Sequence, residues 1–192
     1  MKAITRVLMA TGLMVTATAA SAHAGHDAGT GFASGLLHPM LGLDHLLAMA
    51  AIGFWSVRQS ATMKNSTPLF VIGGMILGAA IAWGGMSLPG VETGIALSVL
   101  LAGILIATMA KLPTAVGGTL VAAFMVFHGF AHGTEMPAGS ALVAYLAGFS
   151  IGTLALTFVG RGLGALMQKT DSRFGRVLGG VVAATGAFLA AA

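Results

Sequence analysis

Long apolar stretches alternate along this chain with short polar connections. After an apolar stretch at the N-terminus, six more follow, each of about 18 to 22 residues. An α-helix rises about 1.5 Å per residue, so about twenty apolar residues cross the ~30 Å hydrocarbon core of a bilayer. The pattern predicts an all-α, polytopic membrane protein. We expect six transmembrane helices at residues 37–57, 67–86, 93–110, 114–132, 139–160 and 174–191.

The N-terminal stretch has the features of a secretory signal peptide over residues 1–22. Two basic residues precede a short apolar core, and the segment ends in the small-residue sequence Ala-Ser-Ala. We therefore expect cleavage after Ala22, followed by a short periplasmic tail at 23–36 that contains His23 and His26. The six-helix domain would then occupy residues 37–192. An uncleaved first transmembrane helix is the alternative.

Basic residues separate the two sides of the predicted bundle. If the mature N-terminus is outside, the first, third and fifth connections are cytoplasmic, and they contain all seven basic residues that follow the signal peptide. These are Arg58, Lys64, Lys111, Arg161, Lys169, Arg173 and Arg176. The two outer connections contain only Glu92 and Glu135 as charged residues. This asymmetry follows the positive-inside rule and predicts a bacterial inner-membrane protein with a periplasmic N-terminus.

Composition agrees with the membrane class, because 57% of the residues are hydrophobic and only 7% are charged. The lipid bilayer is therefore an expected partner, whereas nucleic acid is not, since the basic residues are scattered in loops. Cysteine is absent, which excludes thiolate metal sites and cysteine nucleophiles. Glycines four residues apart, as at Gly74 and Gly78, suggest close helix packing. Homo-oligomerisation stays open.

Two histidine clusters interrupt the apolar stretches, HPMLGLDH at residues 38–45 and FHGFAHGTE at residues 127–135. Together they contain four of the six histidines and two of the five acidic residues. Ionisable groups are costly in lipid and usually mark a substrate or ion pathway. The predicted topology places the first cluster in the outer half of the first span and the second at the outer end of the fourth. We therefore predict that they form a single site.

Helical spacing predicts how these side chains are directed. His38 and His45 are seven residues apart, and His128 and His132 are four apart, so each pair is expected to share one helix face. Asp44 is turned by about 100° from His45. It could bind a ligand from the flank of the site or hold a neighbouring imidazole in place.

The residues around the clusters have less specific interpretations. Pro39 suits the first turn of a helix. Glu135 continues the histidine face only if the helix persists through Gly133, and otherwise it lies over the entrance. Trp55, near the inner end of the first span, is interpreted as an interfacial anchor.

Neutral imidazole and carboxylate without thiolate form a ligand set for divalent first-row ions: nickel, cobalt, zinc, copper(II) or iron(II). Nearby methionines keep copper(I) open. The candidate metal ligands are His38, Asp44, His45, His128, His132 and Glu135, with His23 and His26 as capture residues. A divalent cation that enters an inside-negative cell gains about 4.6 kcal/mol per 100 mV, so uptake needs no ATP.

The two clusters resemble the paired motifs of the HupE/UreJ family of membrane proteins. The first matches H-P-x-x-G-x-D-H over residues 38–45, and the second matches F-H-G-x-A-H-G-x-E over residues 127–135. The resemblance covers essentially the whole chain. It implies a secondary permease for nickel or cobalt in which the six cluster residues recognise or translocate the metal. It does not fix which metal is carried.

These observations predict a permease rather than an enzyme, with Ni²⁺ as the first candidate substrate, Co²⁺ next, and Zn²⁺ or copper as further options. One alternative is an intramembrane zinc hydrolase, in which three of the histidines bind zinc and Asp44 or Glu135 is the base. Another is bis-histidine ligation of haem between the first and fourth spans. In the simplest interpretation the histidines are structural and only form hydrogen bonds between helices.

Overall fold

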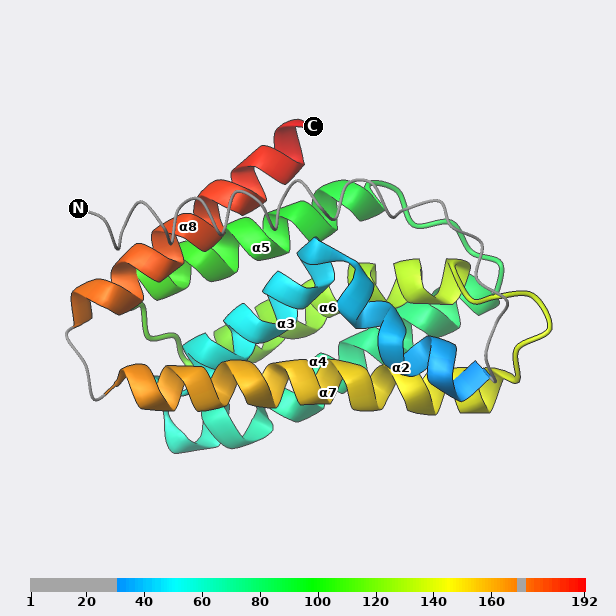
Figure 1. The fold of residues 1–192 in the computed structure, drawn as a ribbon, viewed down its shortest axis with the longest axis horizontal. Coiled ribbons are helices and arrows are strands. Elements are labelled where there is room, and N and C mark those ends of the chain that lie inside the picture. Colours follow the sequence, from blue (N-terminus) through cyan, green and yellow to red (C-terminus); the bar gives the residue numbers. More distant parts are fainter. Residues whose placement is uncertain (1–30, 169–171) are drawn as a thin grey trace, which may run out of the picture.

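The computed structural model describes residues 31–168 and 172–192, and within these ranges the regular structure is entirely helical. Seven helices occur there: α2 (Gly31–Leu41), α3 (Leu43–Ser56), α4 (Ala61–Trp83), α5 (Val91–Ala107), α6 (Thr114–Thr134), α7 (Leu142–Met167) and α8 (Ser172–Ala191). The longer helices lie side by side along the long axis of the molecule (Figure 1). The predicted signal peptide, His23 and His26 lie outside the described residues.

Four of these helices, α4, α6, α7 and α8, are long and apolar enough to cross a membrane. The bent pair α2 and α3 would count as a fifth span, and α5, with 17 residues, is slightly shorter than the rest. The prediction of an all-α, multi-pass membrane protein is therefore confirmed. The number of six spans stays a prediction.

The first predicted span is wrong as a continuous helix. The chain breaks at Gly42, whose backbone is extended (φ −90°, ψ 122°), and the axes of α2 and α3 are bent by 80°. Pro39 lies inside α2 rather than in a first turn. It lacks the N–H that would continue the helix, and its ring crowds the preceding turn. α2 also begins at Gly31, inside the segment 23–36 that was expected to be a tail.

The helices pack in three groups: α4 with α6, α2 and α3 with α7, and α5 with α8. Glycines make the contacts within these groups close. A Cβ atom on Gly78 of α4 would overlap the carbonyl oxygen of Val126, and one on Gly129 of α6 would overlap that of Met75. The same close approach occurs on α7, where Gly148 and Gly152 contact α2, and Gly160 and Gly164 contact α3. The predicted close helix packing is confirmed at these pairs.

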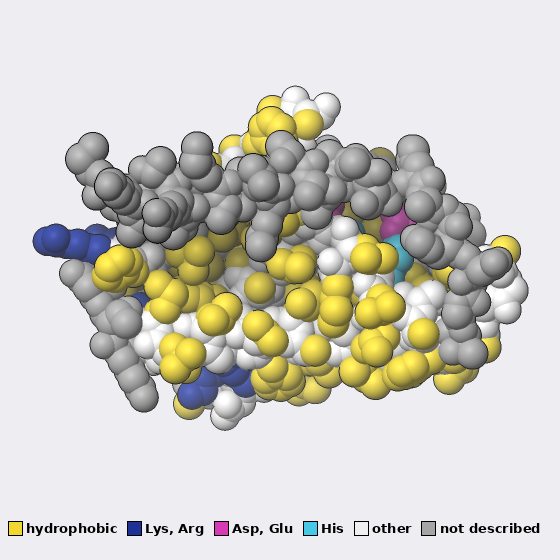
Figure 2. All heavy atoms as spheres, viewed as in Figure 1, with side chains coloured by type: hydrophobic (Ala, Val, Ile, Leu, Met, Phe, Trp, Pro, Cys, Tyr) yellow, Lys and Arg dark blue, Asp and Glu magenta, His cyan; other side chains and the backbone are white. Residues whose placement is uncertain are grey.

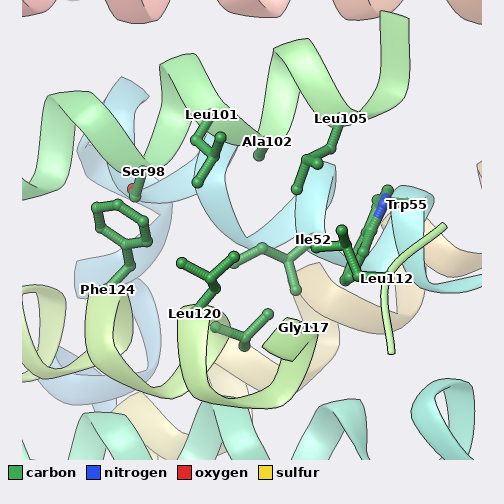
Figure 3. Close-up of a pocket in the computed structure, with 11 residues that line it drawn as sticks. Ile52, Trp55, Ser98, Leu101, Ala102, Leu105, Leu112, Gly117, Leu120 and Phe124 are labelled. Atoms are coloured by element: carbon green, nitrogen blue, oxygen red, sulfur yellow. The ribbon is translucent and has the colours of Figure 1, made fainter. Parts of the chain in front are cut away.

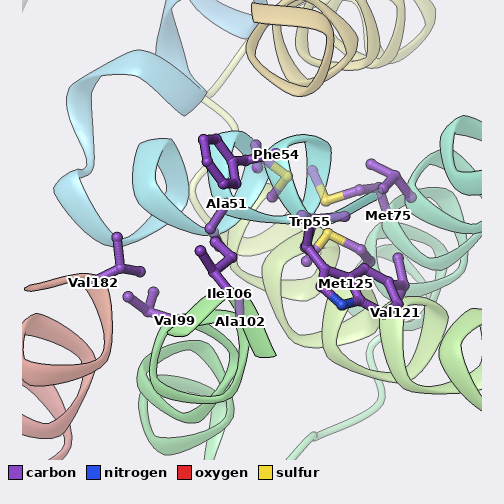
Figure 4. Packing of buried hydrophobic residues seen from close by; sticks show 14 of the residues in the cluster. Ala51, Phe54, Trp55, Met75, Val99, Ala102, Ile106, Val121, Met125 and Val182 are labelled. Carbon is purple, nitrogen blue, oxygen red and sulfur yellow. The ribbon is translucent and has the colours of Figure 1, made fainter. Parts of the chain in front are cut away.

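The apolar core lies where α3, α5 and α6 face one another. Phe54 and Trp55 of α3, Val99 of α5 and Met125 of α6 are all buried in it, together with Met75 of α4 (Figure 4). In α3 these residues come after His45, and in α6 Met125 comes before His128. The core therefore continues from the candidate site towards the end of the molecule where α3 finishes and α6 begins.

Trp55 is not an interfacial anchor, because it is only 3% exposed. Its Nε1 donates a hydrogen bond to the carbonyl of Ala110, at 2.9 Å, in the connection between α5 and α6. Gln59 binds the same connection: its Nε2 donates to Ala110 at 3.0 Å, and its Oε1 accepts from the backbone N–H of Leu112 at 3.0 Å. Trp55 and Gln59 thus attach the end of α3 to that connection.

Charges are distributed unevenly along the long axis. The Lys and Arg side chains visible in Figure 2 gather at one end of the molecule, whereas acidic and histidine side chains are visible towards the other. The helices α3, α5 and α7 finish at the basic end, whereas α4 and α6 finish at the opposite end (Figure 1). Glu92, in the first turn of α5, and Glu135, at the end of α6, belong to that opposite end.

The close contact of α4 and α6 makes a testable prediction about stability. We expect Gly78→Val to lower the thermal unfolding temperature of the detergent-solubilised protein, because overpacking a tight contact costs about 1–3 kcal/mol. Gly73→Val is the matched control, since a Cβ there meets nothing within 4 Å. Both variants place the same residue in the middle of the same helix. Equal unfolding temperatures for the two would contradict the packing described here.

Candidate metal site

The structure brings the two histidine clusters together. The ring centroid of His45 lies 4.5 Å from that of His128 and 4.7 Å from that of His132. The ring of His38 lies 4.8 Å from that of His132. All three pairs pack edge to face. The four imidazoles therefore form one continuous group, which we call the histidine cluster.

The break in the first span determines how this cluster forms. The expected shared face of His38 and His45 on one straight helix is wrong, because His38 lies in the last turn of α2 and His45 in the first turn of α3. A straight helix would separate two such residues by about 10 Å along its axis. The bend at Gly42 instead lets both rings pack against the same partner, His132.

Exposure falls steadily from the edge of the cluster to its interior. The side chains of Glu135 and His38 are 54% and 27% exposed, respectively. His45 is 8% exposed as a residue, and His128 and His132 are fully buried. Glu135 and His38 therefore form the accessible edge, with the other three histidines behind them.

Glu135 stays next to the cluster because α6 continues through Gly133 and ends only at Thr134. Its Oε2 lies 2.6 Å from Nε2 of His38. This hydrogen bond lowers the pKa of the Glu135 carboxyl below its usual value, although partial burial opposes the shift. Because a carboxylate only accepts hydrogen bonds, Nε2 of His38 carries the ring proton and Nδ1 keeps its lone pair.

Asp44 contacts His45 twice. Its Oδ1 accepts a hydrogen bond from the backbone N–H of His45 at 2.7 Å and lies 2.9 Å from the ring atom Nδ1. Because a carboxylate only accepts, Nδ1 carries the proton, and Nε2 keeps its lone pair. Asp44 thus orients His45 from the first turn of α3. Carboxylates hold metal-binding imidazoles in the same manner in many metal sites.

Four ring nitrogen atoms of the cluster are buried and have no hydrogen-bond partner among the described residues: Nε2 of His45, Nδ1 of His128, and both nitrogens of His132. An unpartnered buried polar atom costs about 1–3 kcal/mol, so it requires an explanation. Neutral imidazole nitrogens bind transition metals. The cluster therefore has the donor chemistry of a metal site.

The rings do not yet surround a common point. Within the described ranges, no three His, Asp or Glu side chains are placed so that they could hold one ion together. The histidine rings instead contact one another directly.

Two polar residues of the site carry little signal in the sequence. Ser98 of α5 is buried, and its Oγ lies 2.8 Å from Nε2 of His128. Tyr145 of α7 is fully buried with its ring 6.2 Å from that of His38, and its hydroxyl has no partner among the described residues. A single serine in an apolar helix is common. Tyr145 is the only tyrosine of the chain, and this rarity could have marked it as a candidate site residue.

A cavity of about 30 Å³ lies beside the cluster, between α3, α5 and α6. Ser98 lies at one end and Trp55 and Leu112 at the other, and the remaining lining is apolar (Figure 3). A cavity of this volume has room for at least one water molecule. No ionisable side chain lines it.

The fold and the cluster define a class: multi-pass helical membrane proteins with a buried group of histidines and carboxylates. The family model described as HupE / UreJ protein matches residues 11–189. Protein HupE of Rhizobium leguminosarum bv. viciae is 41% identical over 171 residues, which cover 88% of this chain and 89% of that protein. The chain therefore belongs to the HupE/UreJ family, as its motifs indicate. No solved structure matches it.

The contact between Glu135 and His38 predicts a pH-dependent contribution to stability. Since the pKa of Glu135 is lowered in the folded protein, the contribution is complete above the usual glutamate pKa and is lost as the pH falls through the lowered value. We therefore expect the unfolding temperature of the wild type to exceed that of Glu135→Gln near pH 7, and the difference to shrink towards pH 3. A difference that grows on acidification would contradict this assignment.

Proposed function

We propose that this protein is a secondary permease that takes up a divalent transition-metal ion across the bacterial inner membrane, with Ni²⁺ as the first candidate and Co²⁺ next. One observation carries the proposal: four histidine rings from α2, α3 and α6 contact one another in a multi-pass membrane protein, and four of their buried nitrogens have no partner. Such a group is costly in a membrane unless it binds something.

The gradient of exposure suggests the order in which an entering ion meets its ligands. Glu135 and His38, at the accessible edge, would contact the hydrated ion first. His132, His45 and His128 would then replace part of its water shell, while Asp44 holds His45 in place or binds the ion itself. The tail residues His23 and His26 would add capture sites before this edge.

The broken first span supports a transport role. Transporters often bind their substrates where a membrane helix is interrupted, because the interruption leaves backbone groups without helical partners, and these can bind the substrate within the membrane. Here the interruption at Gly42 lies between His38 and Asp44. The N-terminal end of α3 carries partial positive charge, which repels a cation, and Asp44 offsets it in the first helical turn.

The charge distribution supports inward transport. With the basic end in the cytoplasm, the histidine cluster lies in the outer half of the bundle and the mature N-terminus is periplasmic. This arrangement counts α5 as a span and makes six in total. The membrane potential would then drive a divalent ion inwards with about 4.6 kcal/mol per 100 mV.

Neither alternative function gains support from the geometry. Because the histidine rings contact one another directly, they leave no space for a porphyrin between them. The cavity beside Ser98 has an apolar lining and is far too small for a lipid substrate. Transport is therefore the function that the described residues support best.

Uptake by cells tests the transport proposal. We expect His45→Ala and His128→Ala to reduce accumulation of radioactive nickel to background at limiting external nickel, because each removes a central imidazole. Thr67→Val is the control, since Thr67 is also a fully buried polar residue but its hydroxyl bonds only its own helix. Membrane levels of each variant are compared by immunoblot. Wild-type accumulation in both histidine variants would overturn the proposal.

Equilibrium binding to the purified protein tests the ligand set and identifies the metal. We expect Asp44→Asn to weaken nickel binding by about 10- to 100-fold, because such outer partners orient the metal-binding imidazole. Competition of bound nickel by cobalt, zinc and copper(I) in the wild type ranks the substrates. Unchanged nickel affinity in Asp44→Asn would exclude the assigned role of Asp44.

A further inference from the structure

Ser98 is the one residue of α5 that bonds the histidine cluster, and its hydroxyl has two neighbours. Its Oγ donates a hydrogen bond to the carbonyl oxygen of Ile95 at 2.6 Å, one turn earlier in the same helix. It also lies 2.8 Å from Nε2 of His128. Both Ser98 and His128 are buried, so bulk water does not compete for these bonds.

The position of the single hydroxyl proton follows from these two contacts. A hydroxyl has one proton to donate, and the carbonyl oxygen of Ile95 is the nearer of its two acceptors, so we assign the proton of Ser98 to that bond. Oγ then presents a lone pair to Nε2 of His128, which carries the ring proton in this assignment. His128 is then the Nε2–H tautomer, with its lone pair on Nδ1. That Nδ1 atom is buried and has no partner among the described residues.

We propose that Ser98 is a positioning residue of the metal site: its hydroxyl fixes the tautomer of His128 so that Nδ1 is available to the ion. The inference rests on the proposed function. It assigns to Ser98 the role that Asp44 has for His45 and Glu135 for His38, since each oxygen accepts a hydrogen bond from the protonated ring nitrogen of its histidine. The three partners come from three different parts of the chain.

A merely structural serine would look different in one respect. Ser56 is also fully buried, and its Oγ donates to the carbonyl of Gly53 at 2.7 Å, three residues earlier. It contacts no histidine. Ser56 therefore repeats the helix bond of Ser98 without the bond to a ring nitrogen, which makes it a matched control.

Nitrogen-15 NMR of the histidine-labelled full-length protein in micelles, without metal, reads the tautomer directly. We expect the His128 ring, assigned by comparison with His128→Gln, to show the Nε2–H form in the wild type. In Ser98→Ala the acceptor is lost, so the ring should shift towards the other tautomer or a mixture, whereas Ser56→Ala should leave it unchanged. A wild-type ring in the Nδ1–H form, or no change in Ser98→Ala, would overturn the inference.

Nickel binding to the same proteins measures the consequence. We expect Ser98→Ala to weaken binding by about 10- to 100-fold, as losses of outer hydrogen bonds to metal-binding histidines do. Ser98→Thr should restore it, because threonine keeps the hydroxyl and its methyl group can enter the adjacent cavity. Ser56→Ala should bind like the wild type.

The two measurements separate the possible failures. If the wild type binds neither nickel nor any of the competing metals cobalt, zinc and copper(I), the proposed function fails, and with it the role of Ser98 towards the ion, whatever tautomer the spectrum shows. If the wild type binds nickel and Ser98→Ala binds equally well, only the role of Ser98 is wrong. If Ser98→Ala does not fold, the wild-type spectrum still decides, because an Nδ1–H ring at His128 would overturn the inference without any variant of Ser98.

Discussion

The break at Gly42 is the constraint on which the candidate site depends. Without it, His38 and His45 would stand about two turns apart on one helix and could not both pack against His132. Pro39 removes one backbone hydrogen bond from the last turn of α2, and it packs next to Gly152 of α7. The same α7 contacts both α2 and α3 closely, so it holds the two half-helices in their bent arrangement.

The cluster is stable in an apolar bundle because most of its protons have defined acceptors. Glu135, Asp44 and Ser98 each bond one nitrogen of a histidine, which leaves the opposite nitrogens unpartnered and directed away from those acceptors. Buried polar side-chain atoms are mostly hydrogen-bonded in native proteins, so the unpartnered nitrogens of His45, His128 and His132 require an explanation. An ion bound at the proposed site would supply their missing partner.

Much of this site could be predicted from the sequence. Segment lengths show where the predicted helices begin and end, and loop charges show on which side of the membrane each end is expected, without any knowledge of side-chain packing. That reasoning placed residues 38–45 beside residues 127–135. It missed the break, since Pro39 is compatible with either a first turn or a helix interior, and only packing against α7 extends α2 back to Gly31. Ser98 was missed because nothing in its apolar neighbourhood distinguishes it from a serine like Ser56 that bonds its own helix.

The three packing groups determine where a transport movement would occur. Gly129 and Gly133 follow His128 and His132 directly in α6 and hold that helix against α4, so these two histidines belong to a rigid pair. His38 and His45 belong to the group of α7, and Ser98 to that of α5 and α8. The cluster therefore lies where all three groups meet, and fewer contacts join the groups than hold each together. A small rotation of one group would separate the ligands and leave the backbone glycine contacts within each group intact, and in the proposed transport cycle such a motion could release an ion inwards.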